Sequence, residues 1–142
     1  MELRYLEGTV NELQSRISMV NSAITEMRVS KITLEGLEKE KKGTELFVPI
    51  GGGSYVKAKL DSAKSVVVGI GADVAVEKTV KETKEELETR IGEMENTREV
   101  LGQQLNQVLG RIQENRSQLE EITSKARQGE NPAGVRQAKK GA

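Results

Sequence analysis

The sequence of 142 residues contains no cysteine and no histidine. Without these residues the chain has no disulfide scaffold, no thiol nucleophile, no imidazole base and few of the usual zinc ligands. Aromatic residues make up only 2% of the chain, so it lacks the large buried side chains on which a compact enzyme core depends. We therefore expect no enzyme: no catalytic residues, no cofactor and no bound metal.

Net charge is lacking as well, because 22 acidic residues balance 22 basic ones. A neutral chain has no overall field that would attract nucleic acid or an anionic membrane surface, so neither is an expected partner. No apolar run approaches the roughly 20 residues of a membrane span, and the first residues lack the apolar core of a signal peptide. We expect a cytoplasmic protein.

The chain has instead two long stretches in which apolar residues recur at alternating spacings of three and four residues. This 3.5-residue period is typical of coiled coils. It predicts helices over residues 1–42 and 79–127, each roughly 60 to 70 Å long at about 1.5 Å per residue. The apolar positions are Leu3, Leu6, Val10, Leu13, Ile17, Val20, Ile24, Met27 and Leu34 in the first stretch, and Val80, Leu87, Ile91, Met94, Leu101, Leu105, Val108, Ile112, Leu119, Ile122 and Ala126 in the second.

Polar residues interrupt this apolar seam at Lys31, Lys84, Arg98 and Asn115. A polar residue at a core position can fix the register of two helices, because it penalises misaligned pairings. In the alternative interpretation the long basic side chains only reach past the core into water. For Asn115 a third role is to help the two helices separate.

Between the helices, residues 44–79 are rich in β-branched residues and turn formers, which indicates short strands. Glycines at 51–53 and the Gly-Ala-Asp sequence at 71–73 are suited to tight turns, so we expect two β-hairpins. The predicted strands lie near residues 45–50, 54–60, 65–70 and 73–78. The predicted fold class is therefore α+β, a long antiparallel two-helix coiled coil with two β-hairpins between the helices.

This organisation makes residues 1–127 one domain and leaves residues 128–142, which have no apolar period, as a disordered tail. About 35 residues of sheet cannot form a core of their own, yet the hairpins are apolar on more than one face. We expect these side chains to be buried by other subunits. The predicted oligomerisation residues are Phe47, Val48, Ile50, Tyr55, Val56, Val67, Val68 and Ile70.

Two segments of the centre carry a specific pattern: residues 46–56 read LFVPIGGGSYV, and residues 69–78 read GIGADVAVEK. The first resembles the LVPIGxGSF hairpin, and the second the VGxGxxxEK hairpin, of the α-type subunit of prefoldin. Possession of two hairpins is a mark of the α type. The run of three glycines exceeds what the family pattern requires.

The resemblance implies a hexamer of two α-type and four β-type subunits, so the expected partners are β-type subunits and a second α subunit. It also implies that the hairpins assemble into an oligomeric β-barrel platform from which the coiled coils extend. Proteins of this kind are ATP-independent chaperones, or holdases, that hold unfolded polypeptides and pass them to a group II chaperonin.

The chain ends of an antiparallel helical hairpin meet at the end remote from the strands. If the helices separate there, their apolar residues form a groove that binds unfolded clients. The predicted client-binding residues are Leu3, Tyr5, Leu6, Val10, Leu119 and Ile122. In the simpler alternative the seam residues among them close the coiled coil, and the protein is a structural spacer or a filament-forming prefoldin relative that binds no client.

Overall fold

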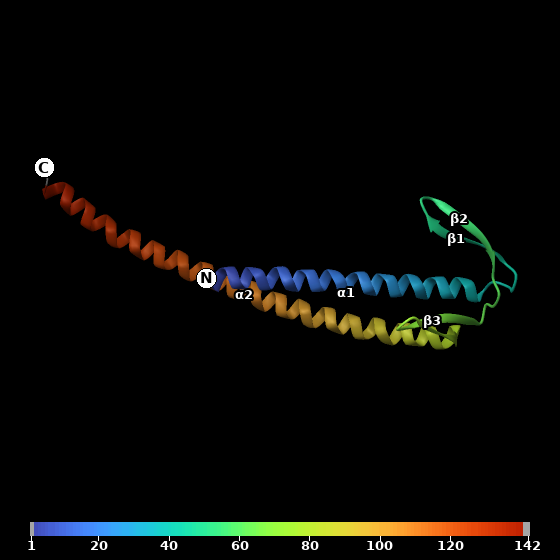
Figure 1. Cartoon of the computed structure of the whole chain (residues 1–142). Helices are drawn as coiled ribbons and strands as arrows, with labels where there is room; N and C mark the ends of the chain where they lie inside the picture. Colours follow the sequence, from blue (N-terminus) through green and yellow to red (C-terminus); the bar gives the residue numbers. More distant parts are fainter. Residues whose placement is uncertain (1, 141–142) are drawn as a thin grey trace. The chain divides into compact units, whose positions relative to one another are not determined.

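The computed structural model describes the backbone of residues 2–140 and the side-chain surroundings of residues 2–128. Two long helices flank four short strands (Figure 1). The elements are α1 (Glu2–Glu38), β1 (Glu45–Gly51), β2 (Ser54–Lys59), β3 (Ser65–Gly71), β4 (Val74–Thr79) and α2 (Val80–Lys140). The predicted fold class is confirmed, and each predicted strand is present to within a residue at its ends.

The chain divides into two compact units, and each contains part of both helices. One unit is Met19–Arg98, and the other combines the described residues up to Ser18 with those from Glu99 onward. Within the unit Met19–Arg98, polar contacts join α1 to α2 in reverse order along the two helices. The pairs are Asn21 with Arg98, Arg28 with Glu95, Lys31 with Glu88 and Glu38 with Lys84. This order is that of an antiparallel helix pair.

The helix ends differ from the predicted ones. Helix α1 ends at Glu38 instead of residue 42, and there the Glu40 N–H donates to the Leu37 carbonyl oxygen at 3.0 Å, a tightened turn typical of helix termini. Helix α2 extends to Lys140 instead of ending at residue 127, although Gly129, Pro132 and Gly134 in this stretch are poor helix formers. The disordered tail predicted for residues 128–142 falls almost entirely outside the residues with described side chains and stays a prediction.

Helix α2 begins directly after β4 because Thr79 caps it. The Glu82 N–H donates to Thr79 Oγ1 at 3.1 Å, which satisfies one of the backbone donors left unpaired at a helix start. The Val80 N–H donates to the Lys64 carbonyl oxygen at 2.9 Å. This second bond fixes the connection before β3 to the start of α2.

Each hairpin is a separate two-stranded antiparallel sheet, β1 with β2 and β3 with β4. In the first, Val48 lies opposite Val56, and in the second Val68 lies opposite Val76. Both turns have two central residues at positive φ, namely Gly52 with Gly53 and Ala72 with Asp73, as a type I′ turn requires. The predicted hairpins and their turn positions are therefore confirmed.

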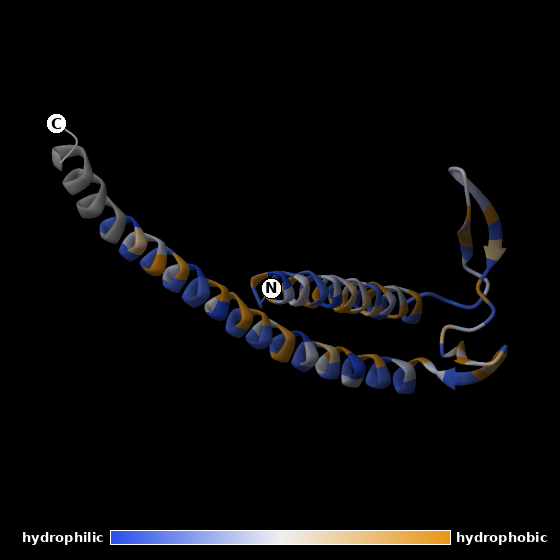
Figure 2. Cartoon of the chain, turned by 60° about the vertical axis from the view of Figure 1, so that its left-hand side comes forward, coloured by the Kyte–Doolittle hydropathy of each residue, from blue (hydrophilic) through white to orange (hydrophobic). Residues whose placement is uncertain are grey.

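Hydrophobic residues occur on both the helices and the strands (Figure 2), but among residues 2–128 the buried ones lie on the helices. The buried apolar residues all belong to the predicted seam: Leu6, Leu13, Ile24, Val80, Leu101 and Ile112. The strands carry apolar side chains that are half-buried or exposed. The helices thus supply their own core, whereas the hairpins leave theirs uncovered.

Candidate functional site

The seam residues of α2 become exposed toward residue 128, the last residue whose side-chain surroundings are described. Leu101 and Ile112 are buried, Asn115 is half-buried, and Leu119 and Ile122 are 54% and 64% exposed although they continue the same period. The exposure of these last two residues therefore does not come from a change in the sequence pattern, and the described residues leave both side chains more than half uncovered.

An open hollow of about 240 Å³ lies at this place, and both helices contribute to it. Leu3 from α1 and Leu119 and Ile122 from α2 give it an apolar lining. Its polar members are Glu2, Asn115 and Gln118. The arrangement offers apolar contact area beside a few hydrogen-bonding groups, which suits an extended peptide better than a small ligand that must be enclosed.

The structure places the six predicted client-binding residues in different surroundings. Leu6 is only 4% exposed and is packed in the seam, while Leu3 and Val10 are half-buried. Tyr5 is 76% exposed and points away from that core. Only Leu3, Leu119 and Ile122 share the hollow, and the client-binding role of all six residues stays a prediction.

Sequence reasoning missed Glu2 and Gln118 as members of the hollow. Neither carries an apolar signal, and their place follows only from the offset at which α1 and α2 pair. Asn115 was singled out as a seam interruption, and it does lie in this hollow. Its position beside Leu119 means that one polar residue interrupts the apolar seam where the side chains of α2 become exposed.

In the same unit, α1 and α2 also contact each other near Glu7 and Arg116. Val10 and Asn11 of α1 face Leu109 and Ile112 of α2 across a second open hollow of about 350 Å³. At its margin the Arg116 guanidinium lies 3.6 Å from the Glu7 carboxylate.

In the unit Met19–Arg98 the polar seam residues bond across the helix pair. Lys84 Nζ donates to Glu38 Oε2 at 2.9 Å, and Arg98 Nη1 donates to Asn21 Oδ1 at 3.1 Å. The hydrogen bond to Glu38 raises the pKa of the Lys84 ammonium group. These contacts join specific positions on the two helices, which favours register fixing over simple tolerance of a polar residue.

Lys31, which interrupts the seam of α1, also has a partner. Its Nζ lies 2.6 Å from Glu88 Oε1 of α2. The hydrogen bond from Lys31, with the positive charge itself, lowers the pKa of the Glu88 carboxyl group below its ordinary value. This contact therefore favours the ionised form of Glu88 in the folded protein.

The predicted oligomerisation residues form the second candidate site. All lie on the strands, and every one except the half-buried Val68 is classed as exposed. The pairing register places Leu46, Val48, Val56 and Ala58 on one face of the first hairpin, so that face is mainly apolar. Such faces on two-stranded sheets are not stable in isolation, which points to burial by other subunits.

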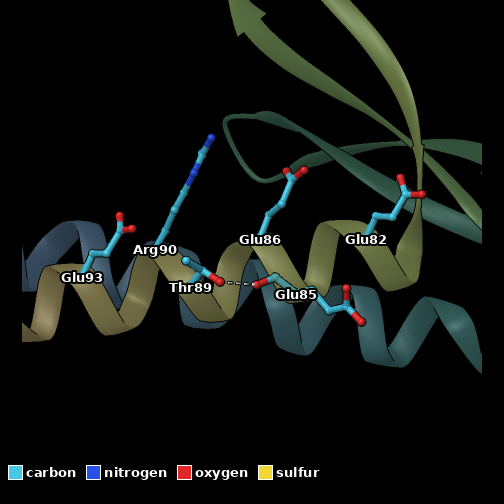
Figure 3. A pocket seen from close by; sticks show the side chains of 6 residues that line it. All are labelled: Glu82, Glu85, Glu86, Thr89, Arg90 and Glu93. Atoms are coloured by element: carbon cyan, nitrogen blue, oxygen red, sulfur yellow. Dashed lines mark hydrogen bonds between the residues drawn. The ribbon is translucent and has the colours of Figure 1, made fainter.

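The acidic start of α2 forms an open hollow lined by Glu82, Glu85, Glu86, Thr89, Arg90 and Glu93 (Figure 3). Lys78 of β4 lies 2.7 Å from Glu86, so a basic residue from the second hairpin meets these acids. Among the described residues, no group of three His, Cys, Asp or Glu side chains is placed to hold a metal ion. The described helices also include none that is long and apolar enough to cross a membrane.

Two long antiparallel helices joined through two open β-hairpins define a class of helical-hairpin proteins whose hairpins require assembly. A profile of the family described as "Prefoldin subunit" matches residues 6–125. The chain belongs to the prefoldin family, as the motifs of its two hairpins indicated. Prefoldins are oligomeric chaperones, not enzymes, and the barrel of the family arises when the open sheets of several subunits assemble.

The relatives are named as α subunits. The chain is 36% identical over 92 residues to prefoldin subunit alpha 1 of Thermococcus kodakarensis, covering 65% of this chain and 63% of that protein. It is 33% identical over 111 residues to prefoldin subunit alpha of Methanopyrus kandleri, covering 73% and 71% respectively.

A solved structure has the same fold. It is the cryo-EM structure of filamentous PFD from Methanocaldococcus jannaschii, with a TM-score of 0.70 and 25% sequence identity. The similarity covers 80% of this chain and 93% of the other.

Proposed function

We propose that this chain is the α-type subunit of an ATP-independent holdase that captures unfolded polypeptides at the ends of its helix pair. In this proposal it acts in the cytoplasm with β-type subunits and a second α subunit, and it passes its clients to a group II chaperonin. Membership of the prefoldin family and the α-subunit names of its relatives support the assignment.

The observation that carries the proposal is the exposure of Leu119 and Ile122 beside Leu3. Covering a Leu or Ile side chain completely contributes about 1.5–3 kcal/mol, and these two are only partly exposed. One helix pair would therefore bind a client weakly. Several pairs carried by one oligomer would act together on the same unfolded chain, which raises the overall affinity without new contacts.

The test is the double variant Leu119→Ser with Ile122→Ser, assembled with β-type subunits. We expect it to lose most of the suppression of light scattering when a chemically unfolded model protein is diluted into buffer. The oligomer should keep its mass in native mass spectrometry, because neither residue lies on a hairpin.

The matched control is Val100→Ser, which removes an equally exposed apolar side chain from α2 outside the hollow. It should suppress aggregation as the unaltered protein does. Unchanged suppression by the double variant would contradict client capture at this hollow, and a loss by both variants would show that exposed apolar area in general is responsible.

A second candidate function is that of a structural, filament-forming relative that binds no client. The observation in its favour is the similarity to a prefoldin described as filamentous. Electron microscopy of the purified chain distinguishes the two functions: filaments that do not suppress aggregation support the structural role, and discrete oligomers that suppress it support the holdase.

A further inference from the structure

A second uncharged stripe runs along α1 on the side opposite the seam. In the unit Met19–Arg98 it contains Ser22, Thr25, Val29, Ile32 and Gly36, at the alternating spacings of four and three residues that keep positions on one helix face. All five are exposed. Val29 and Ile32 are 56% and 66% exposed, so the described part of the chain, its own hairpins included, leaves more than half of each uncovered.

This composition is unfavourable for a helix face in water. Ser, Thr, Val and Ile form helices less readily than Ala, and Gly36 costs about 1 kcal/mol relative to Ala. A Cβ atom added at Gly36 would meet no heavy atom within 4 Å, so the space above the glycine is open. The outer patch, defined as Val29, Ile32 and Gly36, is thus flat, apolar and accessible on the last turns of α1 before the hairpins.

The first hairpin also has a mixed face that barrel assembly does not explain. Glu45 lies opposite Lys59, Phe47 opposite Lys57 and Pro49 opposite Tyr55, so the pleat places these apolar and charged side chains on one side of the sheet. Strands in a barrel direct alternate residues inward and outward, and in this proposal the more apolar Val48 and Val56 face is the inward one. The Phe47–Tyr55 face, with Phe47 64% and Tyr55 62% exposed, then remains outside.

We propose that the outer patch of one copy of this chain binds the Phe47–Tyr55 face of a second copy. Both halves of the contact are on the same chain, so two copies related by a two-fold axis make it twice. Glu26, one turn before Val29 on α1, supplies a negative group for Lys57 beside Phe47. Glu26 and Lys57 are thus one complementary pair of charges at the margins of the two surfaces.

The surface involved has the size of a weak, reversible interface. Each of the two contacts covers four large apolar side chains, Val29 and Ile32 on one copy and Phe47 and Tyr55 on the other, all now more than half exposed. Together with their surroundings, two such contacts approach the roughly 1,000 Å² that a specific interface requires. The outer patch lies on the last turns of α1, the part of this helix that is nearest to β1 along the chain.

Cysteine crosslinking tests the contact cleanly, because the natural sequence has no cysteine. Full-length Ile32→Cys and Phe47→Cys variants are mixed and oxidised mildly, and the dimer disulfide is identified by mass spectrometry. We expect a disulfide between residues 32 and 47 to form at least about ten times faster than in the control mixture of Val100→Cys with Phe47→Cys. If the disulfide between residues 32 and 47 forms no faster than in the control mixture, the proposal is overturned. This holds even if a different subunit covers the outer patch.

The double variant Ile32→Cys with Phe47→Cys tests whether the first hairpin of the same chain, and not that of a second copy, covers the outer patch. An intrachain disulfide in a monomer would show that the hairpin folds onto its own helix, and this result would also overturn the proposal. In a separate measurement by analytical ultracentrifugation, Ile32→Glu should raise the dissociation constant of self-association at least about tenfold. Val100→Glu should leave it unchanged, and both variants should keep the helical circular dichroism.

Discussion

Ala72 and Asp73 occupy left-handed backbone conformations, with φ of 51° and 59°. They are the only non-glycine residues with positive φ among those the structure describes. An L-residue in this conformation costs roughly 1–2 kcal/mol, because its Cβ approaches the following carbonyl oxygen. The turn requires it nevertheless, since only a primed turn has the twist of the strands that it joins. The second hairpin is therefore less stable than its apolar content suggests.

Replacing this pair with the preferred turn sequence, Ala72→Asn with Asp73→Gly, should stabilise the second hairpin by about 1 kcal/mol. The measurement is amide hydrogen exchange in the assembled protein, where the β3 and β4 amides should exchange about five times more slowly. The amides of β1 and β2 provide the internal control. Faster exchange in β3 and β4 would mean that flexibility introduced by the new glycine outweighs the relief of strain.

At the scale of the helices and strands, the period of the sequence predicted which residues face the partner helix but not how well each is covered. Ile112 and Leu119 occupy equivalent seam positions one heptad apart, yet one is buried and the other is 54% exposed. The difference depends on the offset at which α1 pairs with α2. The apolar period of neither helix encodes this offset. The same offset decides that Glu2 and Gln118 join the hollow of Leu3.

The hairpins were predictable in more detail because their signals are local. Two glycines at 52 and 53 and the Gly-Ala-Asp sequence fixed both turns, and a two-residue turn fixes the register of its strands. By contrast, the partner of Lys31 lies 57 positions away on another helix, so its contact with Glu88 could not be read from neighbouring residues. Cross-helix ion pairs of this kind follow from the pairing of the elements.

The contact between Lys31 and Glu88 predicts a pH dependence of the helix pair. Because the pKa of Glu88 is lower in the folded protein than its ordinary value of 4.5, the ionised carboxylate stabilises the fold above that pH. This contribution is lost as the pH falls through the lowered, folded-state pKa. The melting temperature of Glu88→Gln should therefore be slightly below that of the unaltered protein at pH 7, and the two should converge in more acidic solution.

Salt provides an independent check, because both side chains are partly exposed and screening weakens their attraction. The difference in melting temperature at pH 7 should shrink in 1 M sodium chloride. Glu85→Gln on the same helix is the control, since Glu85 belongs to none of the ion pairs found among the described residues. A difference that persists at low pH would assign the effect of Glu88→Gln to helix propensity instead of charge.

For the whole molecule, the distribution of apolar burial separates two tasks. The helices bury their seam in each other, while the strands keep apolar faces exposed in the single chain. Two-stranded sheets of this size are marginally stable in water. Composition and pattern therefore predicted that the hairpins need other subunits. The number and identity of those subunits depend also on the surfaces of the partner chains, which this sequence does not encode.

This separation predicts that assembly can be lost without loss of the helix pair. Val68 lies opposite Val76 on the apolar face of the second hairpin, so Val68→Asp would place a charge where other subunits must cover the sheet. We expect the oligomer to dissociate, seen as a several-fold fall in mass by light scattering, while helical circular dichroism is retained. Ala75→Asp is the matched control, because Ala75 lies on the opposite face of the same hairpin, paired with Gly69. An oligomer of unchanged mass with Val68→Asp would mean that this face is not buried in the assembly.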